Sequence, residues 1–356
     1  MKKSNFKSIE ALRKELIRQR EASQDLIVDT SCLSINSTRG SSVVCVATDN
    51  ALHRFNVQPN AHKQLSEFLG IPYRYYQRLL LEKPKLFDDT INALLTTNHQ
   101  KRLLRITDGN IKAFLSDRYK PLNSIHLLDR LQLELSQQVS YQMVDMAIED
   151  GSFVVKLVNR GKKAEVAGST FYSGVVVIND ETGNGSVRVQ PSLFKIKGKT
   201  WVISGEHMYK KHHLGKQITT DRDYYVFEQA LSEESTCFAS AVKRAFDALQ
   251  GENFDLMVNQ LRKAQQIDVR QNPIKIVEVL TDKYMLTKQD KAAVLMHYIK
   301  NGDITVYGLI NALSCAAKDN NSCLSAVKLE RIGGLLLNDA VGDNEEEFKN
   351  TLPKAA

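Results

Sequence analysis

The chain has 356 residues, of which 42% are hydrophobic and 25% are charged, and its formal net charge is +7. These proportions are typical of globular proteins, and no stretch is apolar over the roughly 18 residues that a membrane span needs, which argues against a disordered chain and against a membrane protein. Five widely spaced cysteines without a Cys-x-x-Cys pair favour reduced thiols in the cytoplasm over a disulfide framework or a cysteine-based zinc site.

The charge is distributed unevenly along the chain. Residues 336–356 contain five acidic residues and two lysines, so the remainder carries a net charge of +10. A basic body of this kind attracts polyanions, and an acidic tail can compete for the same surface or bind a protein partner. The alternative is that the charge only keeps the protein soluble.

Residues 1–58 are predicted to form an N-terminal unit with one helix and one hairpin. Apolar residues recur at helical spacing over residues 8–24 with Lys and Arg between them, which predicts an amphipathic helix with a basic face that extends as an arm. Residues 42–48 and 51–57 are strand-like runs on either side of Asp49-Asn50, a link of the hairpin type.

The next two helices have the order of a helix-turn-helix. Asn60 can cap a helix that Gly70 ends, and Pro72 starts a second helix with three tyrosines at positions 73–76. A short connection that contains glycine is typical of DNA-reading motifs. Bulky aromatics at the start of the second helix favour packing into a core instead, and this is the interpretation that we adopt.

Residues 59–220 are predicted to form an α+β core domain, in which antiparallel hairpins alternate with packed helices. The tight turn at Asp108-Gly109-Asn110 defines one hairpin, and Pro191 marks a position where a strand is expected to break. The predicted order is helix 85–97, hairpin 101–116, helix 124–138, hairpin 141–158, basic loop 160–163, and strands 171–178, 186–196 and 200–204.

Helical periodicity dominates after Arg222, which predicts a helical C-terminal domain over residues 221–337. Thr287 and the pair Asn301-Gly302 are ordinary start and stop residues of one of these helices. An acidic tail over residues 338–356 is expected to be disordered. The predicted helices cover residues 242–249, 254–265, 273–280, 288–298, 306–317 and 323–337.

Lysines concentrate between Leu193 and Lys216, where they face a single acidic residue, Glu206. Apolar residues and lysines alternate over residues 194–197, so one face of a strand can be buried while the other presents ammonium groups. Phosphates favour such an array because neutralising them releases counterions, and Trp201 can stack on bases. The alternative is a solvated lysine face with Trp201 in the core.

A second basic group lies on the hairpin over residues 101–116 and just after it. Two hairpins in one sheet could combine both groups into a groove that follows a nucleic-acid backbone. An ion pair of Arg105 with Asp108 or Asp117 is the alternative role for that residue. The predicted nucleic-acid-binding residues are Arg102, Arg105, Lys112, Arg118, Tyr119, Lys195, Lys197, Lys199, Trp201, Lys210 and Lys211.

The sequence predicts neither a metal site nor another cofactor, and no catalytic residue. His207, His212 and His213 lie near Cys237, but two adjacent histidines on a regular strand cannot both face one ion. Asp180 and Glu181 lack the Glu-x-Lys partner of a restriction-type nuclease and are predicted to shape a turn. No dinucleotide, Walker or common hydrolase motif is present.

Several short motifs from Asn60 onward occur together in one known family. They are Leu69-Gly70-Ile71-Pro72, Leu103-Leu104-Arg105, Phe114 to Tyr119, Asn179 to Gly183, Asn311-Ala312-Leu313 and Leu329 to Gly334. In these motifs the chain resembles the phage/plasmid-like proteins of the domain-of-unknown-function family 932. The resemblance implies an α+β core and a setting in the DNA metabolism of mobile elements, without a particular reaction. The chain departs from the family at Asp180, where Ser is usual, and at residues 200–205, which replace a Cys-x-Asn-Gly motif.

The leading hypothesis is a non-enzymatic, nucleic-acid-binding protein of phage or plasmid type in the cytoplasm of a bacterial host. Its partner would be DNA, which it would anneal or protect as single strands, as a homo-oligomer. One alternative is a metal-dependent nuclease that uses Asp180, Glu181 and the histidines. Another is a host-modulating protein whose helical region and acidic tail bind a protein partner.

Overall fold

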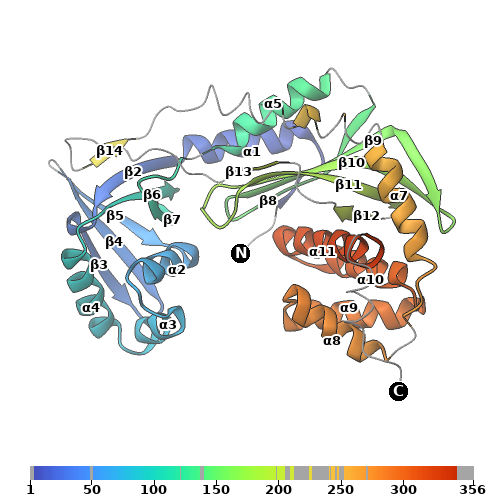
Figure 1. Cartoon of the computed structure of the whole chain (residues 1–356). Coiled ribbons are helices and arrows are strands. Elements are labelled where there is room, and N and C mark those ends of the chain that lie inside the picture. The colour runs from blue at the N-terminus through green and yellow to red at the C-terminus, as the bar shows by residue number, and fades with distance from the viewer. Residues whose placement is uncertain are drawn as a thin grey trace.

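The computed structural model describes residues 4–48, 51–120, 122–136, 140–197, 199–204, 209–211, 224–226, 240, 242–244, 247, 252–269 and 272–342. The chain forms two lobes, each built on one seven-stranded sheet. Figure 1 shows the lobes side by side, with α1 (Ile9–Glu21) and α5 (Ser124–Ser136) above the sheet of the second lobe. Within these ranges, no helix combines the length and apolar character that a membrane crossing requires.

The first lobe contains sheet B, whose strands are antiparallel except where β5 pairs with β7. Three helices cover one face: α2 (Pro59–Phe68), α3 (Tyr73–Glu82) and α4 (Pro84–Thr97). Tyr76 and Phe87 are fully buried in the core between them. The strands follow the order β14 (Tyr224–Val226), β2 (Ser23–Asp29), β6 (Lys101–Thr107), β7 (Asn110–Ser116), β5 (Ala51–Val57), β4 (Ser41–Thr48) and β3 (Leu33–Thr38).

Side chains of α4 cap the outer edge of sheet B. Asn92 accepts a hydrogen bond from the backbone N–H of Ile35 at 2.7 Å and donates to its carbonyl oxygen at 3.0 Å. Asp88 accepts from the N–H of Ser37 at 2.9 Å. An edge strand otherwise presents unpaired backbone groups to neighbouring chains, so these contacts protect β3 from pairing with a second molecule.

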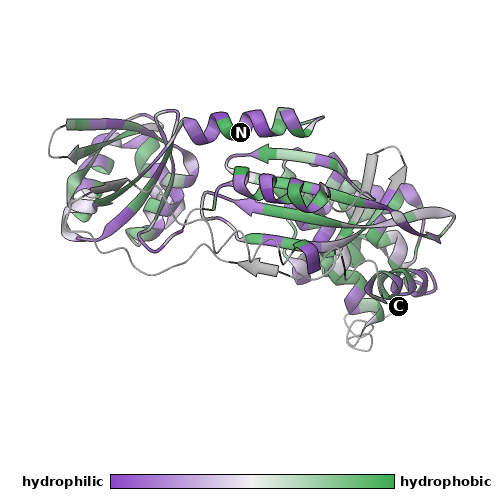
Figure 2. Cartoon of the chain, turned by 90° about the horizontal axis from the view of Figure 1, so that it is seen from above, coloured by the Kyte–Doolittle hydropathy of each residue, from purple (hydrophilic) through white to green (hydrophobic). Residues whose placement is uncertain are grey.

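The second lobe contains sheet A, which lies between two layers of helices. Figure 2 shows its central strands as predominantly hydrophobic ribbons, in accord with burial on both faces. α1 and α5 cover one face, and the C-terminal helices pack against the other. The strands are β1 (Ser4–Asn5), β8 (Tyr141–Glu149), β9 (Ser152–Val166), β10 (Ser169–Asp180), β11 (Val187–Lys197) and β12 (Lys199–Ser204), with β13 (Tyr209–Lys211) beside the start of β11.

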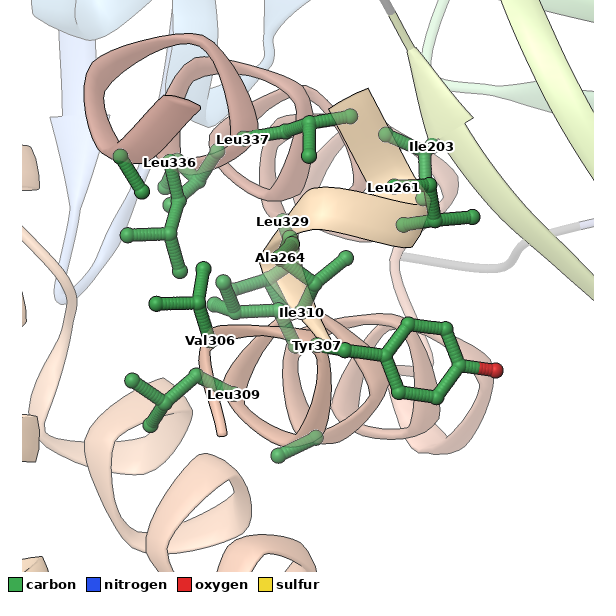
Figure 3. Close-up of a cluster of buried hydrophobic side chains, with 14 of the residues drawn as sticks. Ile203, Leu261, Ala264, Val306, Tyr307, Leu309, Ile310, Leu329, Leu336 and Leu337 are labelled. Atoms are coloured by element: carbon green, nitrogen blue, oxygen red, sulfur yellow. The ribbon is translucent and has the colours of Figure 1, made fainter. Parts of the chain in front are cut away.

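The C-terminal helices share one large apolar core. Leu261, Ile310 and Leu329 point into it from three different helices (Figure 3). Thr287 and Thr305 cap two of the helices by accepting backbone hydrogen bonds from Asp290 and Gly308. The helices are α7 (Glu252–Ala264), α8 (Pro273–Tyr284), α9 (Lys288–Asn301), α10 (Val306–Asp319) and α11 (Cys323–Val341).

The structure confirms the predicted fold class, with antiparallel hairpins, packed helices and a helical C-terminal region. Residues 1–58, however, supply strands to both sheets, because β1 pairs with β8 and β2 pairs with β6. α1 is not an arm, since Leu12 and Leu16 are buried against α5 and sheet A. Pro191 does not break its strand and pairs with Val175. The acidic tail beyond Gly342 lies outside the described residues.

Candidate functional site

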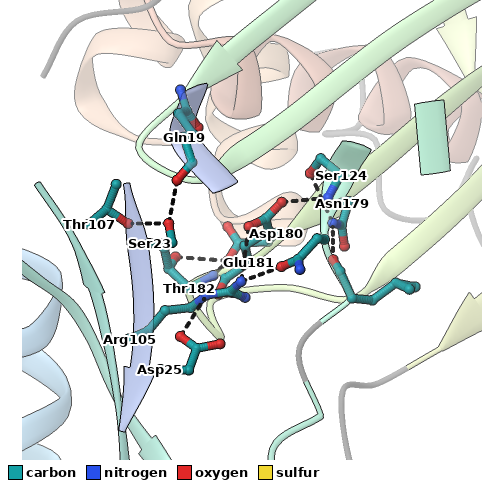
Figure 4. A network of polar contacts seen from close by, with 12 residues as sticks. Gln19, Ser23, Asp25, Arg105, Thr107, Ser124, Asn179, Asp180, Glu181 and Thr182 are labelled. Atoms are coloured by element: carbon teal, nitrogen blue, oxygen red, sulfur yellow. Dashed lines mark hydrogen bonds and ion pairs between the residues drawn. The ribbon is translucent and has the colours of Figure 1, made fainter. Parts of the chain in front are cut away.

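The two lobes meet where the loop after β10 of sheet A contacts sheet B. Arg105 on β6 is buried there and donates from Nη1 to the carbonyl oxygen of Glu181 at 3.1 Å (Figure 4). Its guanidinium also lies 3.3 Å from Glu181 Oε2 and 3.4 Å from Asp25 Oδ1. Burial acts to lower the pKa of Arg105, but Asp25 and Glu181 outweigh this effect and the pKa is raised. Arg105 is therefore a charged clamp between the lobes.

Asp180 fixes the shape of the same loop. Its Oδ1 accepts from the backbone N–H groups of Thr182 at 2.9 Å and Asn184 at 3.2 Å, and its Oδ2 accepts from Ser152 Oγ at 2.5 Å. Gly183 has a φ of +80°, and a Cβ there would lie 2.4 Å from Leu115 Cδ2 of the other lobe. The predicted turn role of Asp180 is confirmed, and the loop can dock closely only with glycine at 183.

The loop is held from several elements of the first lobe. Tyr119 donates from its hydroxyl to the carbonyl oxygen of Asp180 at 3.3 Å, and Asn60 and Gln64 both donate to that of Thr182, at 3.3 and 2.7 Å. Three of the motifs on which the predicted resemblance rests thus converge here: Leu103-Leu104-Arg105, Phe114 to Tyr119, and Asn179 to Gly183. Their contacts show that they join the lobes.

A polar cleft of about 440 Å³ lies beside this junction, between α1, sheet B and the end of sheet A. Its cations are largely balanced, because Arg18 pairs with Asp108 at 3.3 Å and Arg105 with its two carboxylates. The cleft therefore does not select strongly for anions. Its charged lining residues are Arg18, Arg20, Arg105, Lys112, Asp25, Asp108, Asp150 and Glu181.

Nothing in the described part of the chain forms a cluster of three or more His, Cys, Asp or Glu side chains suited to a metal ion. Asp180 already accepts four hydrogen bonds, one of them from the hydroxyl of Thr182, and Glu181 is engaged with Arg105. The predicted histidines at 207, 212 and 213 and Cys237 lie outside the described residues. The other four cysteines form no disulfide with a described residue.

The predicted basic group on the hairpin over residues 101–116 does not form one groove. Arg102 and Arg105 lie on opposite faces of β6, with Arg102 stacked 4.0 Å above the ring of Phe68 on α2. Lys112 is the additional residue of a β-bulge in β7 and lines the cleft, and Arg118 is exposed. Tyr119 is buried like Arg105, so neither side chain can reach a nucleic acid at the surface.

The predicted lysine-rich group between residues 193 and 216 is divided between the two ends of β11. Lys195, Lys197 and Lys199 lie at the β11–β12 turn, with Trp201 paired to Lys195. Lys210 and Lys211 of β13 pair with Arg188 and Val187 at the opposite end. The seven residue steps from Arg188 to Lys195 span about 23 Å of strand. The side chains of Lys197, Lys199, Trp201, Lys210 and Lys211 lie outside the described part of the structure.

The end of sheet A that holds Lys195 gathers further cations. Residues 160–163, predicted as a loop, belong to β9. Asn159 pairs with Ser173, and Lys163 pairs with the adjacent Tyr172. The three residues between them, 160–162, therefore form an insertion in the strand. α7 runs beside this end, since Arg262 donates to the carbonyl oxygen of Glu165 at 3.1 Å. We call the six cations at this end of the sheet the distal surface: Arg160, Lys162, Lys163, Lys195, Arg262 and Lys263. Lys195 pairs with Phe171 and Lys163 with Tyr172, so the side chains of these two lysines lie on opposite faces of the sheet.

Most of these cations lack an acidic partner. Lys162 pairs with Asp255 at 3.2 Å, whereas Arg160, Lys163, Arg262 and Lys263 form no ion pair with any residue that the structure describes. The guanidinium of Arg160 lies 5.4 Å from the ring centroid of Tyr172, which is partly exposed. The run Arg160 to Lys163 is visible in the sequence, but its proximity to α7 depends on tertiary packing.

Comparison with known proteins gives no match, whether with protein families, curated proteins or solved structures. The resemblance to family 932 therefore remains a prediction from the motifs.

Proposed function

We propose that this chain binds nucleic acid, with the distal surface as the part that contacts the phosphate backbone. The observation that carries the proposal is a set of exposed cations around the strand insertion that have no acidic partner among the described residues: Arg160, Lys163, Arg262 and Lys263. Exposed cations that are not neutralised by the protein attract polyanions and can displace their condensed counterions.

The insertion in β9 also provides a platform for bases. Arg160 lies over the ring of Tyr172, so a planar cation and an aromatic ring are stacked at the surface. Such surfaces bind the unstacked bases of single strands with little sequence preference. We therefore propose single-stranded DNA as the preferred partner, which the chain anneals or protects. The resemblance to phage/plasmid-like proteins supports a setting in the cytoplasm of a bacterial host.

The proposal predicts a defined salt dependence. Single strands lose affinity with a slope of about −0.7 per neutralised phosphate in a plot of log K against log salt. With about five phosphate contacts the slope is about −3.5, so affinity falls on the order of 100-fold between about 50 and 200 mM salt.

A titration of labelled single-stranded and duplex DNA at several salt concentrations tests the proposal. The variant Arg160→Ala/Lys163→Ala/Arg262→Ala should bind less tightly, and its slope should be shallower by about 2. Lys14→Ala/Lys275→Ala/Lys300→Ala is the matched control, because it removes the same charge at exposed positions elsewhere. Equal loss in both variants, or no binding of either DNA at low salt, would refute the proposal. An annealing assay on the same samples separates annealing from protection.

A further inference from the structure

Arg188 at the start of β11 is a cation without a partner among the residues that the structure describes. Its Nε is buried with no hydrogen bond, and no hydrogen bond or ion pair joins its guanidinium to another residue of the described chain. Burial lowers the pKa of Arg188, and the positive charge of Arg331 lowers it further. The side chain is only partly exposed, so water does not fully solvate this charge.

Arg331 comes to Arg188 from α11, across the face of sheet A. Val327, one helical turn earlier, packs in the same apolar cluster as Ile178, which pairs with Arg188 in the neighbouring strand. The adjacent Glu330 anchors the helix through an ion pair of 2.6 Å with Lys156 of β9. Glu330 is thereby engaged with Lys156, and Arg331 itself forms no ion pair with a described residue.

Gln190 supplies a second, independent sign of an absent ligand. It lies two residues after Arg188, on the same face of β11, and its side chain is completely buried. Neither its Oε1 nor its Nε2 has a hydrogen-bond partner in the described part of the chain. Buried amides are nearly always hydrogen-bonded, so a buried amide with two unsatisfied atoms beside an unpaired guanidinium indicates a missing partner.

The nearest acidic group does not fill this role. Asp180 raises the pKa of Arg188, but its effect is smaller than the opposing effects of burial and of Arg331. Its carboxylate already accepts hydrogen bonds from Ser152, Thr182 and Asn184. Gly185 lies beside the guanidinium, since a Cβ there would be 3.9 Å from Arg188 Nη2. The loop therefore passes this cation with no side chain of its own at that position.

We propose that Arg188 and Arg331 form a binding site for a phosphate group. Phosphate fits because two guanidiniums offer it several charge-assisted hydrogen bonds and because its charge removes their mutual repulsion. Arg188 lies about 23 Å along β11 from Lys195, so this site is separate from the distal surface and does not depend on the proposed nucleic-acid function.

Calorimetric titration of the full chain with inorganic phosphate, a nucleoside monophosphate and a short oligonucleotide tests the site and identifies the source of the phosphate. Binding of at least one probe is expected. Binding of a small probe indicates a free phosphate compound. Binding of the oligonucleotide alone indicates backbone phosphate at this site only if the distal variant Arg160→Ala/Lys163→Ala/Arg262→Ala retains it. The variants Arg188→Gln and Arg331→Gln should each weaken binding about 10- to 100-fold, because each removes charge-assisted hydrogen bonds.

The control is the distal triple variant described above, which should bind the small probes like the wild type. Arg331 is partly exposed. Because Arg331→Gln removes the repulsion between Arg331 and Arg188, the melting temperature of this variant should equal or exceed that of the wild type. A folded Arg331→Gln protein that binds as tightly as the wild type would overturn the proposal. So would the absence of heat with all three probes.

Discussion

Replacement of Arg105 by methionine should destabilise the junction between the lobes severely. The side chain is only 6% exposed and faces Asp25 and Glu181 at 3.4 and 3.3 Å. Removing one member of a buried ion pair costs about 3–5 kcal/mol, because the remaining charge stays buried without compensation. Asp25 is the more buried of the two carboxylates, and its burial already raises its pKa.

Urea denaturation of Arg105→Met and of the wild type measures this loss. Arg118→Met is the control, because Arg118 carries the same charge shortly after β7 but is exposed. The control should stay within about 0.5 kcal/mol of the wild type. If Arg105→Met also stayed within about 1 kcal/mol, the clamp would not hold the lobes together, and the reasoning would fail.

The pH dependence of this variant follows from Asp25. Burial raises its pKa, and Arg105, which opposes the rise, is absent in the variant. The folded variant therefore binds a proton that the unfolded chain releases, and its stability falls as the pH rises. The deficit relative to the wild type should be smaller at about pH 5 than at about pH 7, and a deficit that grew on acidification would contradict this sign.

Three further changes test individual contacts. Gly183→Ala should lower the free energy of unfolding, measured by urea denaturation, by about 1–3 kcal/mol. The loss should exceed that of Gly168→Ala, because both glycines have a positive φ but only a Cβ at 183 would lie against the other lobe. Asn92→Ala should remove the cap of β3 and increase aggregation, which light scattering would detect as concentration-dependent growth. Lys156→Met should lower the free energy of unfolding by about 3–5 kcal/mol, because it leaves Glu330 buried without its partner. The added change Glu330→Leu should restore most of this stability, and a double variant no more stable than Lys156→Met would refute the expectation.

The predictable parts of the fold are those that short-range signals define. Asp108-Gly109-Asn110 makes a tight turn from its own residues, and Thr287 and Gly302 mark the ends of α9 locally. The strand at residues 23–29 was missed because it follows a helix directly and acquires its partner only when residues 101–107 fold beside it. Its strand character depends on pairing across more than 70 residues of sequence.

The candidate sites show the same limit. From the sequence, the predicted partners of Arg105 are Asp108 or Asp117, the nearest acidic residues. In the structure its partners are Asp25, which lies opposite it on β2, and Glu181, which comes from the loop of the other lobe. Which acidic residue pairs with a cation depends on tertiary contacts and not on their distance along the chain. Tyr119 was predicted as a stacking residue for a related reason, since nothing local reveals that the junction between the lobes buries it.

Photo-crosslinking of a halogenated single-stranded oligonucleotide to the full chain tests the location of the nucleic-acid site most directly. The proposal predicts that crosslinked peptides map to the distal surface, with Tyr172 of β10 among the modified residues. It also predicts that Arg160→Ala/Lys163→Ala/Arg262→Ala lowers the yield. Crosslinks confined to the lobe of sheet B, or a yield that is unchanged in that variant, would contradict it.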